Sequence, residues 1–293
     1  MPDGPDCHMR SDALVRLGSA DAERFGTTHP NDSSMMINGQ SMRLTTLIKT
    51  VAARFGLGIF DVRGRYAQDG LFTVHGDHFR ADPGFRAAYG RGVQAGHGVD
   101  PAFEWRVHIA LWAARAGLRA DGEFVECGVN AGIVSSAIMA ALRWNMVGRR
   151  FYLIDTFTGP VITQYSQDEV RDGRATLASQ ALDAGAYVTD MDRVRANFAE
   201  WPNAIIIRGS IPEVLEKTDI GMVAFLHIDM NCALPERAAF EFFWERLSPG
   251  AVVLFDDYAY YGHDHQRKSI DAAARARGAE VLSLPTGQGL IIK

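Results

Sequence analysis

Residues 124–142, FVECGVNAGIVSSAIMAAL, decide the fold of this chain. A short apolar run with one acidic residue, Glu126, leads into a turn that Gly128 and Gly132 flank, and the residues from Ile133 onward follow helical spacing. Short apolar runs are typical of buried strands, and glycine allows the backbone of a turn to approach a ligand closely. The stretch therefore predicts a strand, a glycine turn and a helix in succession.

Further apolar runs repeat this alternation with helical segments along the chain. They are RFYLIDTF (150–157), AIIIRGS (204–210), VAFLHIDM (223–230) and AVVLFDDY (251–258). Near-continuous apolar strands with helices between several of them predict a parallel sheet covered on both faces, which is a doubly wound α/β fold. EVLSLPTGQGLIIK (280–293) contains two strand-like runs joined by a Pro/Gly turn, so we expect the last strand to be antiparallel.

The N-terminal part of the chain differs in composition and in hydrophobic periodicity. Residues 1–40 are rich in polar and turn-forming residues without periodicity, which predicts a mobile tail. Helical spacing over 42–60 and 100–117 predicts amphipathic helices within a helical extension or lid over 41–118. We therefore expect the sheet to form within residues 119–293.

The composition is that of an ordinary globular protein. Of 293 residues 47% are hydrophobic, and the formal net charge is -5, so there is no overall basic field of the kind that nucleic-acid binding requires. Three widely spaced cysteines argue against a disulfide framework and against a cysteine-based zinc site. Because no signal-peptide pattern or long apolar run is present, we expect a cytoplasmic protein without a membrane span, which could form homo-oligomers.

The strand ends carry the residues expected to bind a ligand, because ligands of doubly wound sheets lie beyond the carboxyl ends of the strands. The E-x-G-x-x-x-G spacing around Gly128 differs from the G-x-G-x-x-G of dinucleotide sites. It resembles the first motif of the class I S-adenosylmethionine-dependent methyltransferases. Asp155 ends the next strand, where a carboxylate can accept both hydroxyls of a ribose. Alternatively, the glycines serve packing alone and Asp155 caps a helix.

These strand ends together predict an adenosyl cofactor site. The resemblance places Gly209 and Ser210, after the following strand, near the adenine. The predicted cofactor-binding residues are Glu126, Gly128, Asn130, Gly132, Asp155, Thr156, Phe157, Gly209, Ser210 and Asp229.

Three aspartates, Asp229, Asp256 and Asp257, end two further strands. Neighbouring strands lie about 4.8 Å apart, so these like charges would crowd into one small volume unless they are protonated or bridged by a cation. Mg²⁺ binds through a few carboxylates and leaves positions open for other oxygens. We therefore predict a divalent metal site at these three residues. The alternative is that each aspartate caps a helix by accepting backbone N–H bonds.

The segments HIDMN, LSPGAVVLFDDY, GHDHQ and LSLPTGQGLIIK, with GEFVECGVNAG and LIDTFTG upstream, resemble the macrocin O-methyltransferase family over roughly residues 105–293. The resemblance implies a Rossmann-like, seven-stranded, mostly parallel methyltransferase sheet. It also implies metal-dependent methylation of sugar hydroxyls on antibiotics, with the metal-binding aspartates at Asp229, Asp256 and Asp257. Antibiotic-modifying members often read D-G-D where this chain has Asp229-Met230-Asn231, and Asn231 cannot accept a proton.

The general base is then expected from the loop that follows the Asp256-Asp257 pair. His263 and His265 are the candidates, His263 first, since a neutral imidazole can accept an alcohol proton near neutral pH. Asn231 could orient the substrate hydroxyl. The alternative for both histidines is a solvated loop position.

The expected reaction is S-adenosylmethionine-dependent, divalent-metal-dependent O-methylation of a sugar hydroxyl on a glycoside, natural-product sugar or polysaccharide. A catechol or phenol methyltransferase would use the same metal geometry. A nicotinamide dehydrogenase would share the sheet but not the glycine spacing. A non-catalytic cofactor-binding protein would keep the glycine turn without needing the three aspartates together. No motif names the acceptor.

Overall fold

The computed structural model describes residues 51–52, 54–55, 66–96 and 98–293. The chain divides into two compact units, Met1–Gly64 and Arg65–Lys293. The predicted tail over 1–40 and most of the predicted helix over 42–60 lie outside the described residues. The second unit carries the sheet.

The strands of the second unit are β1 (Tyr66–Gln68), β2 (Leu71–Thr73), β3 (Glu123–Cys127), β4 (Phe151–Asp155), β5 (Ala204–Arg208), β6 (Val223–Ile228), β7 (Leu247–Phe255), β8 (Leu282–Ser283) and β9 (Gly289–Ile292). The α-helices are α2 (Pro83–Ala95), α3 (Glu104–Gly117), α4 (Ile133–Leu142), α5 (Gln167–Arg171), α6 (Arg174–Asp183), α7 (Met191–Phe198), α8 (Ala233–Trp244) and α9 (Asp264–Arg275). Short 3₁₀ turns are η1 (His78–Ala81), η2 (Trp144–Met146), η3 (Ile162–Gln164) and η4 (Leu215–Lys217).

The main sheet has seven strands in the order β5-β4-β3-β6-β7-β9-β8. Strands β5, β4, β3, β6 and β7 are parallel, and β9 pairs antiparallel with both β7 and β8. The predicted doubly wound, mostly parallel sheet with an antiparallel last strand is confirmed. The chain proceeds from β3 through β4 to β5, then returns to the other side of β3 as β6, so the switch point lies between β3 and β6.

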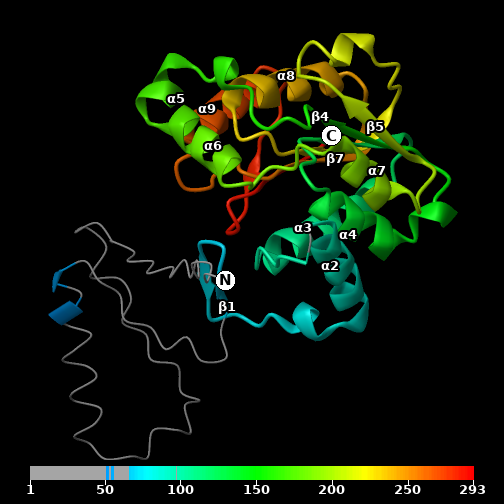
Figure 1. Ribbon diagram of the computed structural model, residues 1–293, viewed down its shortest axis with the longest axis horizontal. Coiled ribbons are helices and arrows are strands. Elements are labelled where there is room, and N and C mark those ends of the chain that lie inside the picture. Colours follow the sequence, from blue (N-terminus) through cyan, green and yellow to red (C-terminus); the bar gives the residue numbers. More distant parts are fainter. Residues whose placement is uncertain (1–50, 53, 56–65, 97) are drawn as a thin grey trace, which may run out of the picture. The chain divides into compact units, whose positions relative to one another are not determined.

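Helices cover both faces of this sheet. Figure 1 shows α8 and α9 on one side of the strands and α2, α3 and α4 on the other. Every residue of β6 is buried, and β3 is buried from Phe124 to Cys127. Burial on both faces explains why these strands are nearly continuous apolar runs and do not alternate with polar residues.

Helices α2 and α3 belong to the same compact unit as the sheet, and this unit begins at Arg65. Helix α2 starts at a favourable cap, since the Asp82 side chain accepts the Phe85 backbone N–H at 2.7 Å and Pro83 follows it. Gly92 then lets α2 lie against α4, because a Cβ there would come within 2.6 Å of the Ile133 carbonyl oxygen. Within the expected extension, residues 83–95 and 104–117 therefore belong to the layer that covers the sheet.

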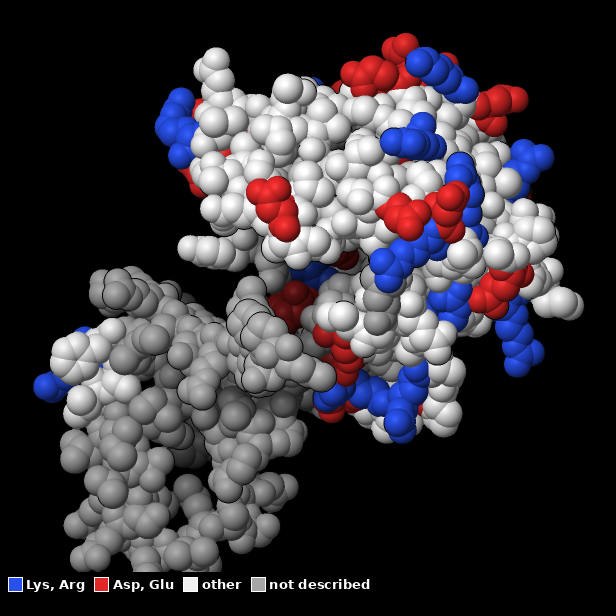
Figure 2. All heavy atoms as spheres, in the orientation of Figure 1, with Lys and Arg blue, Asp and Glu red and all other residues white. Residues whose placement is uncertain are grey.

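The surface of the second unit mixes both signs of charge. On the face shown in Figure 2, Lys and Arg side chains alternate with Asp and Glu. Within the described part of the chain, no helix combines the length and apolar character needed to cross a lipid bilayer. Cys127 and Cys232 are buried free thiols, as expected from their spacing.

Gly128, directly after β3, gives a test of this packing. Its φ is 89°, and a Cβ there would lie 1.7 Å from the carbonyl oxygen of Asp229. We expect Gly128→Ala to lower the free energy of unfolding by about 3 kcal/mol or more, because left-handed strain and atomic overlap each cost about 1–3 kcal/mol. Thermal unfolding followed by circular dichroism measures the loss.

Gly148 is the matched control, since its φ is 72° and its Cβ would meet nothing within 4 Å. Gly148→Ala should show the cost of the left-handed backbone alone, about 1 kcal/mol. Equal decreases of Tm in the two variants would contradict the close approach of the two strand ends.

Candidate active site

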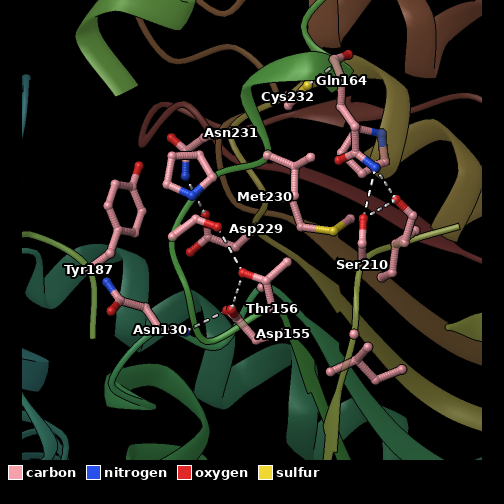
Figure 3. A pocket seen from close by; sticks show the side chains of 18 of the residues that line it. Asn130, Asp155, Thr156, Gln164, Tyr187, Ser210, Asp229, Met230, Asn231 and Cys232 are labelled. Carbon is pink, nitrogen blue, oxygen red and sulfur yellow. Dashed lines mark hydrogen bonds between the residues drawn. The ribbon is translucent and has the colours of Figure 1, made fainter. Parts of the chain in front are cut away.

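A pocket lies at the carboxyl ends of β3, β4, β5 and β6, beside the switch point (Figure 3). It holds about 780 Å³ of empty space, part of it open to solvent. This is the place where doubly wound sheets bind their ligands. The predicted cofactor-binding residues that line it are Gly128, Asn130, Asp155, Thr156, Gly209, Ser210 and Asp229.

Asp155 at the end of β4 holds the glycine turn in place. Its Oδ2 accepts the backbone N–H groups of Val129 at 2.7 Å and Asn130 at 2.9 Å, and its Oδ1 accepts that of Phe157 at 2.7 Å. These N–H groups belong to turns, and the N-cap of α4 is Gly132, so Asp155 does not cap that helix. A carboxylate has about four lone-pair sites, so Asp155 keeps acceptor capacity toward a hydroxyl in the pocket.

Asn130 joins the glycine turn to the segment that carries Tyr187. Its side chain donates to the Ala186 carbonyl oxygen at 3.0 Å and accepts the Val188 N–H at 2.8 Å. Figure 3 shows Tyr187 and Asn130 on the same side of the pocket. Burial, and then the nearby carboxylates of Asp229 and Asp257, raise the pKa of Tyr187. Sequence reasoning missed Tyr187 because its surroundings carry no motif.

On the opposite wall of the pocket, Gln164 forms hydrogen bonds to the residues that follow β5. Its Nε2 donates to Ser210 Oγ at 3.0 Å and to the Ile211 carbonyl oxygen at 2.6 Å. This links η3 to the residues after β5. Further lining residues that the sequence did not predict are Tyr165, Met230 and Cys232.

Glu126 is not among the pocket-lining residues, contrary to the prediction. It is buried, and its Oε1 pairs with His227 Nδ1 at 2.9 Å. The reason is the register of the sheet, which pairs Glu126 directly with His227, so that the two side chains project to the same face. Its Oε2 is buried without a hydrogen-bond partner among the described residues.

Gly132 and Phe157, which were also predicted to contact the cofactor, do not line the pocket. Gly132 precedes α4 with φ of 83°, and a Cβ there would lie 2.4 Å from Phe198 Cζ, so its small size serves helix packing. Phe157 is completely buried in the hydrophobic core. Both residues shape the turns around the pocket without lining it.

The carboxylates after β7 are paired with a buried arginine. Arg106 Nη1 donates to Asp256 Oδ2 at 2.5 Å and to Asp257 Oδ1 at 3.0 Å, and its Nε donates to Asp69 Oδ2 at 2.6 Å. The repulsion between Asp256 and Asp257 is therefore offset without a bound metal ion. The chain supplies a cation of its own from α3.

The pKa values of the carboxyl groups in this cluster depend on the charges of their neighbours. Burial raises the pKa of Asp256, but the Arg106 guanidinium and His227 outweigh it and hold that pKa well below its usual range. Burial, followed by the carboxylates of Asp256 and Asp257, raises the pKa of Asp229 well above its usual range. Asp256 is therefore ionised at neutral pH, and its charge makes ionisation of Asp229 less favourable.

The predicted metal-binding set does not fit a divalent ion in this arrangement. Among the residues that the structure describes, no group of three or more His, Cys, Asp or Glu side chains is arranged to hold a metal ion. Arg106 takes one oxygen each of Asp256 and Asp257, and Gln288 Nε2 donates to the other Asp256 oxygen at 2.7 Å. Asp229 has a single described contact, from Asn231 Nδ2 to its Oδ1 at 3.4 Å.

The predicted catalytic residues have three different surroundings. Asn231 lines the pocket, with φ of 57°. His263 is buried, with Nδ1 lying 3.7 Å from Asp257 Oδ2 and Nε2 accepting a hydrogen bond from Arg174. His265 lies on α9 with its Nε2 2.7 Å from Asp172 Oδ2, so it contacts neither the pocket nor the aspartates. The structure therefore places Asn231 in the pocket, His263 beside Asp257 and His265 beside Asp172.

Arg106 is the functional residue that sequence reasoning missed, although a signal for it exists. Helix α3 buries a stripe that includes Val107, Ala110 and Ala114, and Arg106 is buried beside it. A positive charge on the buried face of a helix needs a partner, so its position predicts an acidic neighbour. The spacing does not say which acid, because Asp256 is 150 residues away.

Comparison with known families agrees with this geometry. Residues 125–258 match the family model described as a methyltransferase domain. The matched residues extend from β3 to the residues after β7.

One relative is, by its name, an O-methyltransferase of a compound that carries a rhamnosyl group. A Streptomyces olivaceus protein, 8-demethyl-8-(2,3-dimethoxy-alpha-L-rhamnosyl)-tetracenomycin-C 4'-O-methyltransferase, is 29% identical over 144 residues, which cover 47% of this chain and 53% of that protein. The chain thus matches about half the length of this relative. The match confirms the resemblance to methyltransferases that the motifs indicated.

Solved structures share the fold. The O-methyltransferase NovP is 18% identical, with a TM-score of 0.55 over 64% of this chain and 79% of that chain. The calicheamicin methyltransferase CalS11 is 17% identical, with a TM-score of 0.48 over 75% of this chain and 98% of that chain. The likeness to NovP shows a shared fold.

The buried His227 makes stability depend on pH. Burial lowers the pKa of its imidazole, but the carboxylates of Asp256 and Glu126 outweigh this effect and raise it to about 10. A raised pKa means that the protonated form stabilises the fold. Its contribution is complete below the ordinary pKa of about 6.5 and is lost as the pH rises to about 10, by at most about 1.4 kcal/mol per pH unit. Urea unfolding between pH 6 and about 10 measures it.

His227→Gln should flatten that decline, while His265→Gln, at a partly exposed pair with Asp172, should leave it unchanged. Parallel stability curves for wild type and His227→Gln would show that His227 is neutral in the folded protein.

Proposed function

We propose that this chain transfers a methyl group from S-adenosylmethionine to a hydroxyl oxygen of a sugar. The observation that carries the proposal is a pocket at the switch point of a methyltransferase sheet, lined by Asp155 and Asp229 and bordered by Asn231. The S. olivaceus relative is a 4'-O-methyltransferase of a rhamnosyl group by its name, and this supports a sugar acceptor. A glycoside, a natural-product sugar and a polysaccharide remain the candidate acceptors.

The pocket residues fit an adenosyl cofactor with a positively charged centre. Asp155 offers its remaining acceptor capacity to ribose hydroxyls, and Gly209 and Ser210 border the region proposed for the adenine. Asp229 places a carboxyl group in the pocket, where a sulfonium would favour its ionised form. When bound, S-adenosylmethionine supplies an electrophilic methyl group and leaves as S-adenosylhomocysteine after the methyl–oxygen bond has formed.

The chain must also orient the acceptor and remove its proton. Asn231 lines the pocket beside Asp229, and its amide can hold a hydroxyl without accepting the proton. His263, which lies beside Asp257, is the general base that accepts the proton of the acceptor hydroxyl in this proposal. Its Nε2 faces Arg174, so an acceptor hydroxyl reaches this nitrogen when the Arg174 side chain turns aside.

Dependence on a divalent ion remains a prediction from the family resemblance. The residues concerned are Asp229, Asp256 and Asp257, two of which are paired with Arg106. Because this arrangement does not fit the ion, no step of the proposed reaction passes through a metal.

Two other functions remain as alternatives. A catechol or phenol methyltransferase would use the same cofactor pocket, and a flat aromatic acceptor could stack on Tyr187 or Tyr165. A non-catalytic cofactor-binding protein would bind S-adenosylhomocysteine without turnover. The acceptor screen below separates these possibilities.

The direct test is a methyl-transfer screen with S-adenosylmethionine, with and without added Mg²⁺. The acceptors are nucleotide sugars, free glycosides, polysaccharide fragments and catechols, and the products are detected by mass spectrometry. We expect a methyl ether of a saccharide. Transfer to catechols alone would replace the sugar assignment, and calorimetric binding of S-adenosylhomocysteine without any transfer would favour the non-catalytic alternative.

The proposal that His263 is the general base predicts opposite outcomes for the two histidines at the start of α9. His263→Gln should lower kcat by about 10²–10⁴, the range for loss of a general base, whereas His265→Gln should keep kcat near the wild-type value. Both variants should bind S-adenosylhomocysteine as wild type does, since neither histidine lines the pocket. Steady-state kinetics and calorimetry measure these values.

The pH profile gives a second readout. Burial lowers the pKa of His263, with Arg174 and Arg106 adding to the effect and Asp257 opposing it. The imidazole therefore stays neutral at pH 7, and kcat/KM should decline only below about pH 6.5. An unchanged profile in His263→Gln would place the base elsewhere.

A further inference from the structure

Arg106 is a buried side chain whose guanidinium is shared by three carboxylates. It is 6% exposed and pairs with Asp69 at 2.6 Å, Asp256 at 2.5 Å and Asp257 at 3.0 Å. A buried charge is tolerated when it is paired and hydrogen-bonded. These contacts make Arg106 the counter-ion of the aspartates that follow β7.

The guanidinium is held from several directions. Its Cζ lies 4.4 Å from the centre of the Tyr260 ring, and the Tyr260 hydroxyl donates to Asp69 Oδ1 at 3.3 Å. Gln288 Nε2 donates at 2.7 Å to Oδ1 of Asp256, the carboxyl oxygen that Arg106 does not contact. Arg106 is therefore packed in place and is not a surface side chain that samples many rotamers.

A divalent ion needs the oxygens that Arg106 already uses. Mg²⁺ binds oxygen ligands at about 2.0–2.1 Å in octahedral geometry. Between Asp256 and Asp257 that volume contains Nη1 of Arg106, and His227 Nε2 lies 3.7 Å from Asp256 Oδ1 on a further side. A second cation there would meet like charge at short range.

We propose that the Arg106 guanidinium occupies the position at which the family resemblance implies a divalent ion. The guanidinium and a divalent ion then cannot both bind Asp256 and Asp257. Wild-type protein then has no tight divalent site at Asp256 and Asp257. The inference concerns the proposed active site but does not depend on methyl transfer, because ion binding can be measured without an acceptor.

The test is a titration of the full chain with Mn²⁺, in which electron paramagnetic resonance reports the free ion. Wild type should bind Mn²⁺ with a Kd no tighter than about 1 mM, and Arg106→Ala should bind at least about tenfold more tightly, since it leaves buried carboxylates without their counter-ion. Adding Asp256→Asn to Arg106→Ala should abolish the gain.

Arg80 provides the matched control. It also pairs with two carboxylates, Asp77 and Glu104, but its side chain is 41% exposed. Water can solvate those carboxylates once the arginine is removed, so Arg80→Ala should create no Mn²⁺ site.

Two results would overturn the inference. The first is tight Mn²⁺ binding by wild type, with a Kd of about 100 µM or lower, that Asp257→Asn abolishes. The second is a folded Arg106→Ala that binds Mn²⁺ no more tightly than wild type. Should Arg106→Ala fail to fold, the wild-type and Asp257→Asn titrations decide alone. An inactive protein in the acceptor screen would leave these titrations unaffected, so the two proposals fail separately.

Discussion

The buried ion pairs of Arg106 connect three separate parts of the second unit. Arg106 comes from α3, Asp69 from the turn between β1 and β2, and Asp256 and Asp257 from the end of β7. Removing one partner of a buried ion pair typically costs about 3–5 kcal/mol, because the other charge stays buried without a counter-charge. The guanidinium therefore adds buried ion pairs to the apolar packing that holds α3 against the sheet, and it connects the hairpin to both.

The register of the sheet explains why so many acids meet there. The backbone N–H of Asp229 donates to the Cys127 carbonyl oxygen at 2.8 Å, and that of Asp256 donates to the Ile228 carbonyl oxygen at 2.9 Å. The ladders thus continue one residue past β6 and β7, so Gly128, Asp229 and Asp256 lie side by side. The close approach that requires glycine at 128 also places the carboxyl groups near one another.

Asp229 is the residue that the cofactor pocket and the carboxylate cluster share. It lines the pocket, while Asp256 and Asp257 contribute to its raised pKa. A cation entering the pocket would favour its ionised form, and the loss of charge on either neighbour would do the same. Ligand binding and the protonation of the cluster are therefore coupled through this carboxyl group.

The sequence by itself determined the strands, their mostly parallel arrangement and the lining residues that directly follow strands, because apolar runs, glycine turns and strand-end positions are local features. The tertiary structure decided the partner of each acid. Sheet register turned Glu126 toward His227, packing of Phe157 and Gly132 kept them out of the pocket, and α3 delivered Arg106 to Asp256. These partners are far apart in the chain, and a pattern of neighbouring residues does not specify which distant side chain will neutralise a buried charge.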